Sequence, residues 1–264
     1  MRRNGSLALA FHALFVVFLL LPLVLVVLVS FTPEGHLSYP TSGVSLRWFR
    51  AILDNPSFID AFWNSLYLAV AAATLAVVLA VPAALAIARY QFAARDWLTG
   101  LFLSPLMIPH IVLGVAFLRF FAQAGLSGTF IGLVCAHVVI IMPYTLRLVL
   151  AAVTGMDRDA ERAACSLGAS RWTVFRRITL PLILPGVTGG WVLAFITSFD
   201  ELSMTIFVAS PSTTTLPVKM YNHIAHTIDP LIASVSTVLI VMTAVFMVVL
   251  DRVYGLDRVL IGKG

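Results

Sequence analysis

Long apolar runs separated by short polar segments dominate the pattern of hydrophobic and polar positions in this chain. Each run holds about 20 residues or more, which is the helix length needed to cross the hydrocarbon core of a bilayer. Pro105 and Pro109 lie inside the third run and are expected to bend that helix. The pattern predicts an all-α membrane protein with six transmembrane helices, near residues 7–30, 62–88, 98–121, 129–150, 182–208 and 231–250.

The composition agrees with a membrane protein, since 60% of the residues are hydrophobic and only 11% are charged. A soluble domain carries about 25% charged residues. The net charge of +5 does not indicate nucleic-acid binding, because the basic residues lie at the ends of apolar runs rather than on one face with aromatic residues. The first run, Leu7–Val29, is longer than the core of a signal peptide, which has about 7–15 residues, and is expected to remain as a span.

The basic residues also predict the orientation of the spans. Most of the 17 Lys and Arg residues belong to the N-terminus, the 89–96 loop, the 147–180 segment and the C-terminal tail. The opposite side of the membrane is left with only Arg47, Arg50, Arg119 and Lys219. Because cytoplasmic loops carry the excess of Lys and Arg, both termini are predicted to be cytoplasmic.

The same pattern divides the chain into three parts. Residues 1–61 are expected to hold the first transmembrane helix and an outer segment, in which Trp48, Phe49 and Ile52 have the spacing of a short interfacial helix. Residues 62–252 are expected to form the membrane core. Residues 253–264 are expected to form a cytoplasmic tail.

The most polar segment of the chain begins at Asp157. The acids in Asp157–Glu161 suit the first turn of a helix, whose dipole they complement, and Gly168 suits the turn that ends it. Trp172, Phe175 and Ile178 then repeat every three residues among arginines, as in a second short helix. Pro181 is expected to end that helix and to start the next span. The segment therefore predicts a helix, a glycine turn and a helix outside the membrane.

The string from Ala163-Ala164 through Gly168 to Leu180-Pro181 resembles the EAA loop of the inner-membrane permease subunits of bacterial ABC importers. In one departure, Arg162 stands where the family has a glutamate directly before the two alanines, and Glu161 lies one place earlier. The resemblance extends over nearly the whole chain. It implies a type I ABC importer permease fold, with a core at 62–252 and a coupling loop at 155–180 that docks on a cytoplasmic ATPase. It assigns this docking to Glu161, Arg162, Ala163, Ala164, Gly168, Ala169, Trp172, Phe175, Leu180 and Pro181.

Three further segments, 103–117, 140–150 and 198–221, look most like the spermidine/putrescine permeases of that family. The resemblance implies transport of a polyamine or a related cationic or amino compound. An opine, aminoethylphosphonate, a metal or another anion remains an alternative substrate. The implied partners are two ATP-binding cassette subunits, a second homologous permease that is a different chain, and a periplasmic or lipid-anchored substrate-binding protein. The implied location is the lipid of the bacterial inner membrane.

The energy for transport must come from a partner. A phosphate-binding loop needs a glycine-rich turn that leads into Gly-Lys-Ser/Thr. The chain has only Lys219 and Lys263, and neither follows such a turn. The chain is therefore predicted to bind no cofactor and to be no enzyme, with ATP and magnesium held by the ATPase subunit.

Asp200 and Glu201 are adjacent acids in the fifth apolar run. Carboxylates at membrane depth usually face a bundle interior or a wet cavity, so these two acids are candidates for the substrate pathway. The alternative is a structural role, in which they cap a helix end or pair with Arg119 or Lys219.

Two other functions were weighed against the residues. The string Gly125–Gly128 (G-L-S-G) could place a serine nucleophile of an intramembrane protease, but the run at 231–250 lacks the histidine base that such an enzyme needs. An ion-driven secondary transporter often has internal repeats, which the chain does not show, and it leaves the polar segment unexplained. No metal site is predicted, because His223 and His226 lack a third ligand. Cys135 and Cys165 are expected to be packing residues.

Overall fold

The computed structural model describes residues 5–254, and every regular element in that range is a helix. Most of the predicted tail at 253–264 lies outside the described residues, as do Arg2, Arg3, Arg258 and Lys263. The elements are α1 (Ser6–Val29), α2 (Arg47–Leu53), α3 (Pro56–Arg89), α4 (Arg95–Leu103), η1 (Ser104–Met107), α5 (His110–Ala124), α6 (Phe130–Gly155), α7 (Asp159–Ser166), α8 (Arg171–Val174), η2 (Phe175–Thr179), α9 (Leu180–Phe199), α10 (Thr205–Val208), η3 (Pro211–Thr213), α11 (Leu216–His226) and α12 (Leu231–Tyr254).

The described residues divide into two compact units. One unit comprises residues 5–60 and 219–249, and the other comprises residues 61–218 and 250–254. The helices α3 and α11 each begin in one unit and end in the other.

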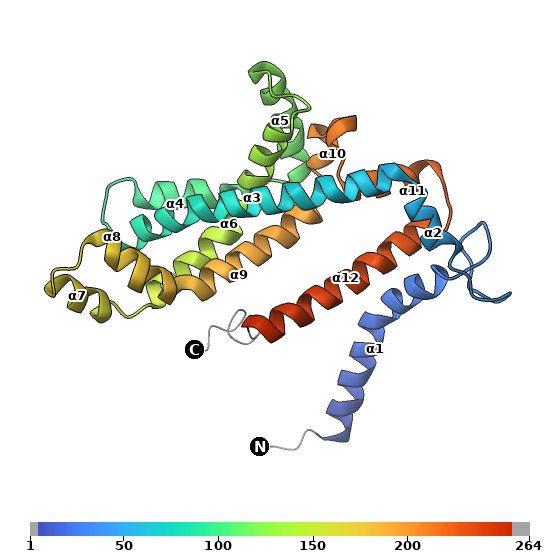
Figure 1. The fold of residues 1–264 in the computed structure, drawn as a ribbon, viewed down its shortest axis with the longest axis horizontal. Helices are drawn as coiled ribbons and strands as arrows, with labels where there is room; N and C mark the ends of the chain where they lie inside the picture. Colours follow the sequence, from blue (N-terminus) through green and yellow to red (C-terminus); the bar gives the residue numbers. More distant parts are fainter. Residues whose placement is uncertain (1–4, 255–264) are drawn as a thin grey trace. The chain divides into compact units, whose positions relative to one another are not determined.

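The second unit is built around α3, α6 and α9. Figure 1 shows α6 and α9 side by side, and their buried residues share one apolar core with the last turns of α3. Alanines line the buried face of α3, so the neighbouring helices approach its backbone closely. Gly186 of α9 does the same: an added Cβ would lie 2.4 Å from the Cβ of Ala152 and 2.8 Å from the carbonyl oxygen of Leu148. The small-residue pair Gly186 and Gly190 thus serves close helix packing.

Five helices in the described residues are long and apolar enough to cross a membrane: Leu7–Val29, Pro56–Arg89, Phe130–Gly155, Arg171–Phe199 and Leu231–Val249. The third predicted span is the exception. It is split into Arg95–Met107 and His110–Ala124, which meet at an angle of 107°. Pro105 is the second residue of the short 3₁₀ turn η1, and Ile108 is held in an extended conformation by the proline that follows it. The prolines therefore bend this run sharply, and the spans number six only if the two pieces count as one.

The fifth predicted span also differs from its prediction of 182–208. The helix begins earlier, because α8, a π-helical turn (η2) and α9 follow one another without a break from Arg171. Pro181 does not end the preceding helix as expected, since the helix continues through the π turn, which ends at Thr179, into α9. The helix also ends earlier, at Phe199, and the apolar residues Thr205–Val208 form a separate short helix.

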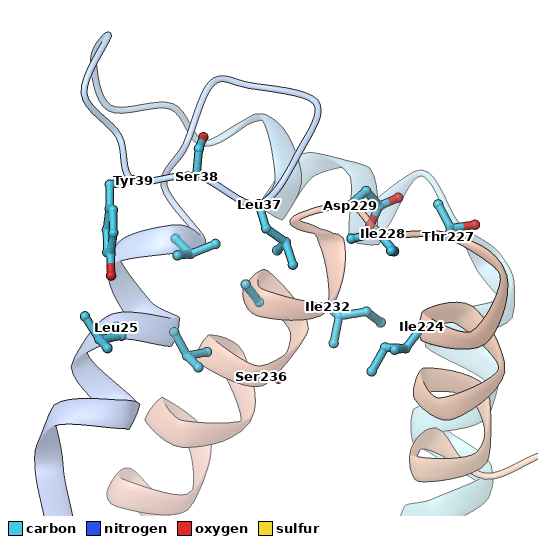
Figure 2. Close-up of a pocket in the computed structure, with 13 residues that line it drawn as sticks. Leu25, Leu37, Ser38, Tyr39, Ile224, Thr227, Ile228, Asp229, Ile232 and Ser236 are labelled. Atoms are coloured by element: carbon cyan, nitrogen blue, oxygen red, sulfur yellow. The ribbon is translucent and has the colours of Figure 1, made fainter.

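The first unit contains α1, α2 and α12. The short helix predicted near Trp48 is present as α2, and the indole N–H of Trp48 donates to the carbonyl oxygen of Glu34 at 3.1 Å. The Ser234 hydroxyl of α12 donates to the carbonyl oxygen of Ser30, at the end of α1, at 3.2 Å. An apolar pocket of about 550 Å³ lies between α1, the loop at 37–39 and the α11–α12 turn (Figure 2). Its one carboxylate, Asp229, is already paired with His223 at 3.1 Å.

Candidate functional site

The polar segment forms the predicted helix, glycine turn and helix. Asp157 accepts a hydrogen bond from the backbone N–H of Asp159 at 2.9 Å, so this acid organises the start of α7. Gly168 follows the end of α7 with φ of +84°, a conformation that glycine adopts without strain. The N–H of Gly168 donates to the carbonyl of Cys165, and that of Ala169 to the carbonyl of Ala164, both at 3.0 Å. These bonds close the turn.

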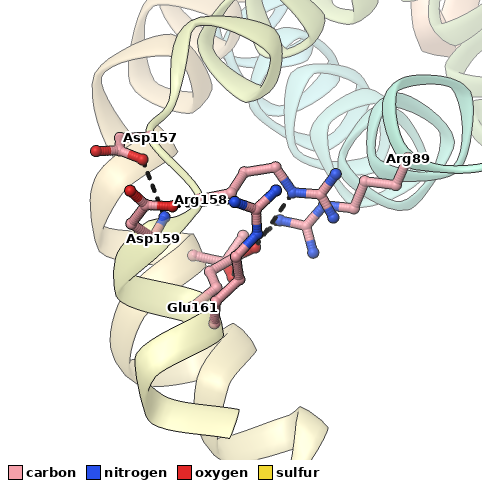
Figure 3. Close-up of polar contacts among 7 residues, drawn as sticks. Arg89, Asp157, Arg158, Asp159 and Glu161 are labelled. Carbon is pink, nitrogen blue, oxygen red and sulfur yellow. Dashed lines mark hydrogen bonds and ion pairs between the residues drawn. The ribbon is translucent and has the colours of Figure 1, made fainter. Parts of the chain in front are cut away.

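Glu161 ties this loop to the membrane helices. Its Oε1 lies 2.6 Å from Arg89 Nη2 at the end of α3, and it also accepts a hydrogen bond from the Thr179 hydroxyl, just before α9. Arg158 approaches the other carboxylate oxygen at 3.9 Å. Figure 3 shows Arg89 and Arg158 reaching toward Glu161. The side chain of Glu161 is buried, so this acid faces into the chain.

Arg89 and Thr179 were missed at the level of sequence. In the sequence, Arg89 contributed only to the predicted orientation of the spans, and 72 residues separate it from Glu161. No local pattern brings such distant residues together, so the sequence offered no signal for this pair.

The other residues predicted to meet the ATPase lie nearer the surface. Those that are exposed are Arg162, Ala163, Gly168, Trp172 and Pro181. Those that are half-buried are Ala164, Ala169, Phe175 and Leu180. Leu167, beside the glycine turn, is 89% exposed, and Trp172 is 67% exposed and stacks on Phe175. The loop thus presents two exposed apolar side chains, Leu167 and Trp172, beside arginine side chains.

The two acids after α9 have different surroundings. Glu201 is buried; its Oε2 lies 2.7 Å from His110 Nδ1, and its Oε1 accepts the N–H of Met204 at 2.8 Å. Its partner is therefore His110 of α5, not Arg119 or Lys219 as the structural alternative had it. The contacts of Glu201 hold the chain in place where it leaves α9. Asp200, in contrast, is exposed, and its carboxylate has no hydrogen-bond partner among the described residues.

Aromatic rings lead along the helices to Asp200. On α9, Trp191 stacks on Phe195 and Phe195 on Phe199, the residue directly before Asp200. Phe199 contacts Phe62 of α3 edge-on, with the ring centroids 6.2 Å apart. Trp63 and Tyr67 stack next to Phe62 on α3, and both are exposed. The faces of such rings attract cations.

The structure also shows the surroundings of the remaining glycines, histidine and cysteines. Gly125 and Gly128 have φ of +70° and +68° and form the turn between α5 and α6 that competed with the protease interpretation. His137, deep in α6, contacts the hydroxyls of Ser198 and Thr205 at 2.8 and 3.0 Å. No cluster of three His, Cys, Asp or Glu suited to a metal occurs in the described part of the chain. Cys135 and Cys165 are exposed rather than packed inside.

Residues 76–256 match the family of binding-protein-dependent transport system inner membrane components. The chain belongs to this family. The permease is thus a multi-pass protein of the bacterial inner membrane. It is 30% identical to the spermidine/putrescine transport system permease protein PotC of Escherichia coli strain K12, over 91% of this chain and 90% of PotC.

Two further comparisons concern a second relative and a solved structure. The permease is 32% identical to the putative 2-aminoethylphosphonate transport system permease protein PhnV of Salmonella paratyphi A, over 91% of each chain. Its fold matches a permease chain in the crystal structure of a bacterial ABC transporter involved in alginate import. That match has a TM-score of 0.73 and 13% identity, and covers 95% of this chain and 96% of the other. The permease therefore has the type I ABC importer fold.

Proposed function

We propose that this permease forms the translocation pathway of an ATP-driven importer for a polyamine or a related cationic amino compound. The observation that carries the proposal is the exposed helix–glycine–helix loop, held to the membrane helices by Glu161, in a member of a binding-protein-dependent transport family. The ATP is hydrolysed by two separate ATPase subunits. A second, homologous permease completes the pathway, and a substrate-binding protein delivers the solute.

The loop is where the ATPase acts on the permease. The exposed side chains of Arg162, Leu167 and Trp172 enter the partner, while the buried Glu161 keeps the loop in position. Because α8, the π turn and α9 are continuous, a displacement of the loop moves α9 as well. Two conformations of the pathway are then biased by contacts made outside the membrane.

The substrate meets Asp200 at the far end of the same helix. A carboxylate without a protein partner attracts an ammonium group, and the aromatic faces beside it stabilise the cation without binding it tightly. The similarity to a 2-aminoethylphosphonate permease makes a zwitterionic amino compound the second candidate, because its ammonium group suits the same acid.

Substitution of Asp200 by Asn tests the substrate. We expect spermidine uptake into proteoliposomes that hold the complete transporter to fall about tenfold, since one charge contact worth about 1.4 kcal/mol is lost. The amount of assembled complex should not change. Glu201→Gln is the matched control: it should lower the yield of folded complex, because Glu201 is buried in the protein. Unchanged spermidine uptake by Asp200→Asn would refute the role of this acid, and the same assay with 2-aminoethylphosphonate tests the second candidate.

Substitution of Gly168 by Asp tests the coupling loop. An L-residue in the left-handed conformation costs about 1–2 kcal/mol, and the added carboxylate opposes a docking surface that we expect to be acidic. Substrate-stimulated ATPase activity should be lost while membrane insertion is kept. Gly155→Asp is the control, because Gly155 is also exposed and open but has no positive φ. Wild-type stimulation in Gly168→Asp would contradict the assignment.

A further inference from the structure

A second pocket lies between the loop and the end of α3, and its lining includes four arginines. It encloses about 380 Å³ and is bordered by Arg89, Tyr90, Arg158, Glu161, Arg162 and Arg171. Four guanidinium groups thus share the pocket with one carboxylate. Of the residues expected to meet the ATPase, Arg162 and Phe175 line this pocket, whereas Leu167 and Trp172 do not.

The described acids neutralise these four arginines only in part. Glu161 is taken up by Arg89 and Thr179, and Arg162 pairs with the exposed Asp159 at 3.1 Å. Arg158 has only the 3.9 Å contact with Glu161. For Arg171, no ion pair is formed with any described residue. The pocket is left with an excess of positive charge.

Arg89, which lines this pocket, has a hydrogen-bond donor that is not used. Its Nη2 binds Glu161, but its buried Nε has no hydrogen-bond partner in the described structure. A buried guanidinium N–H without a partner costs free energy unless a ligand or water satisfies it. A small shift of the side chain would turn this donor toward a bound anion.

The pocket lies beside the end of α3 and the start of α9. Arg89 is the last residue of α3, and Thr179 directly precedes α9. Tyr90 in the pocket and Trp97 on α4 are both strongly exposed, as aromatic residues at the level of lipid headgroups usually are. Basic pockets between span ends are suited to the phosphates of anionic lipids.

We propose that this pocket binds a phosphate-type oxyanion, clamped by Arg158 and Arg171 above Arg89. Guanidinium groups bind phosphate through two parallel N–H···O bonds, which suits several arginines around one small pocket. The anion is the headgroup of an anionic phospholipid or free phosphate. Its binding would brace the loop against α3, and this consequence for coupling rests on the proposed function.

The binding experiment uses the complete transporter in vesicles of phosphatidylcholine alone, or of phosphatidylcholine and phosphatidylglycerol in equal parts. Retained phosphatidylglycerol is measured by mass spectrometry after extraction into detergent, and radiolabelled inorganic phosphate is measured on the neutral vesicles. The test variant is Arg158→Gln/Arg171→Gln. The control is Arg176→Gln/Arg177→Gln, which removes two exposed charges from the same segment outside the pocket.

We expect the test variant to bind the anion about tenfold more weakly than the wild type, and the control to bind it as the wild type does. A loss of lipid alone identifies the headgroup as the source, and a loss of phosphate alone identifies free phosphate. Arg158→Lys/Arg171→Lys should keep part of the binding. Such partial binding would show that the loss in the Gln variant comes from the missing guanidinium groups and not from misfolding. Equal binding by test variant, control and wild type would overturn the proposal, as would an equal loss in the control. Because the readout is binding, a failure of polyamine uptake would leave the result standing.

Discussion

At the scale of single residues, the position of the acid in the coupling loop explains Arg162. Consecutive residues of a helix point about 100° apart, so Glu161 and Arg162 face different surroundings. Glu161 is buried and bonded to Arg89 and Thr179, whereas Arg162 is exposed and pairs with Asp159. An acid at position 162 would face water and could not make the contact with Arg89. The anchoring charge in this chain is therefore Glu161.

Removing that charge should loosen the loop. Glu161→Gln leaves the Arg89 guanidinium largely buried without a counter-charge, which typically costs about 3 kcal/mol. We expect the melting temperature of the purified complex to fall by about 6–10 °C, and the loop to become accessible to trypsin at Arg158 and Arg162. Both are measured on the same preparation.

The control for this variant is Asp159→Asn in the same helix. Asp159 is strongly exposed, and an exposed ion pair contributes no more than about 1 kcal/mol. Equal stability losses in the two variants would show that the network around Glu161 is not the anchor.

At the scale of elements, the pair α6 and α9 determines how the loop is connected to the pathway. The two helices pack closely because Gly186 leaves room for Ala152 and for the backbone at Leu148. Such proximity makes the pair rigid, since any added atom must displace a neighbouring backbone. We infer that α6 and α9 move together during transport.

Gly186→Ala should therefore be poorly tolerated although it adds one methyl group. Its Cβ would lie 2.4 Å from the Cβ of Ala152, so the helices must separate, at a cost of about 1–3 kcal/mol. The yield of folded permease, measured by fluorescence-detected size-exclusion chromatography, should fall. Gly190→Ala is the matched control, because its Cβ would meet its nearest neighbour at 3.4 Å. A normal yield for Gly186→Ala would argue against rigid packing of this pair.

Hydropathy predicted which stretches of the chain become spans but not where every helix stops. Pro105 and Pro109 announced the bend in the third span, because proline acts locally. The end of α9 at Phe199 was not predicted, because apolar residues resume at Leu202 and Met204, beyond the two acids. What stops the helix is a tertiary contact, the carboxylate of Glu201 with His110 and with the N–H of Met204. The prediction that Pro181 ends a helix was wrong, because the helix continues through a π turn and into α9.

The candidate site likewise has a part that the sequence predicts and a part that it does not. The spacing from Ala163 to Pro181 sufficed to predict the glycine turn, because a turn depends on neighbouring residues. The partners Arg89 and His110 could not be predicted, because each is far along the chain from the acid that it binds. A pair of distant residues is defined only once the helices are packed.

At the scale of the whole molecule, the distribution of basic residues predicts that the coupling loop and both termini share the cytoplasmic side. The two cysteines provide a direct measurement of this orientation. Cys165 is exposed on α7, and Cys135 is exposed on the membrane-spanning helix α6.

A membrane-impermeant maleimide should label Cys165 in inverted membrane vesicles, but not in right-side-out vesicles. Peripheral subunits are first removed with alkali, so that the loop is uncovered. Cys135 should stay unlabelled in both preparations, because lipid excludes a charged reagent. The variants Cys135→Ser and Cys165→Ser assign the signal to one residue. Labelling of Cys165 from the outside would reverse the predicted orientation.

The number of residues between the loop and α9, which includes the π turn at Phe175–Thr179, determines how the loop is oriented about the axis of α9. A π turn contains roughly one residue more than an α turn, so deleting one residue there would restore a regular helix. Because a π turn and an α turn each complete about one revolution, the loop would keep its angle about the axis of α9. A deletion within α9 itself would instead rotate the loop by about 100°. In a variant with a deletion within α9, the surface that contacts the ATPase would point away from it. The permease would then be folded and inserted in the membrane but uncoupled from the ATPase.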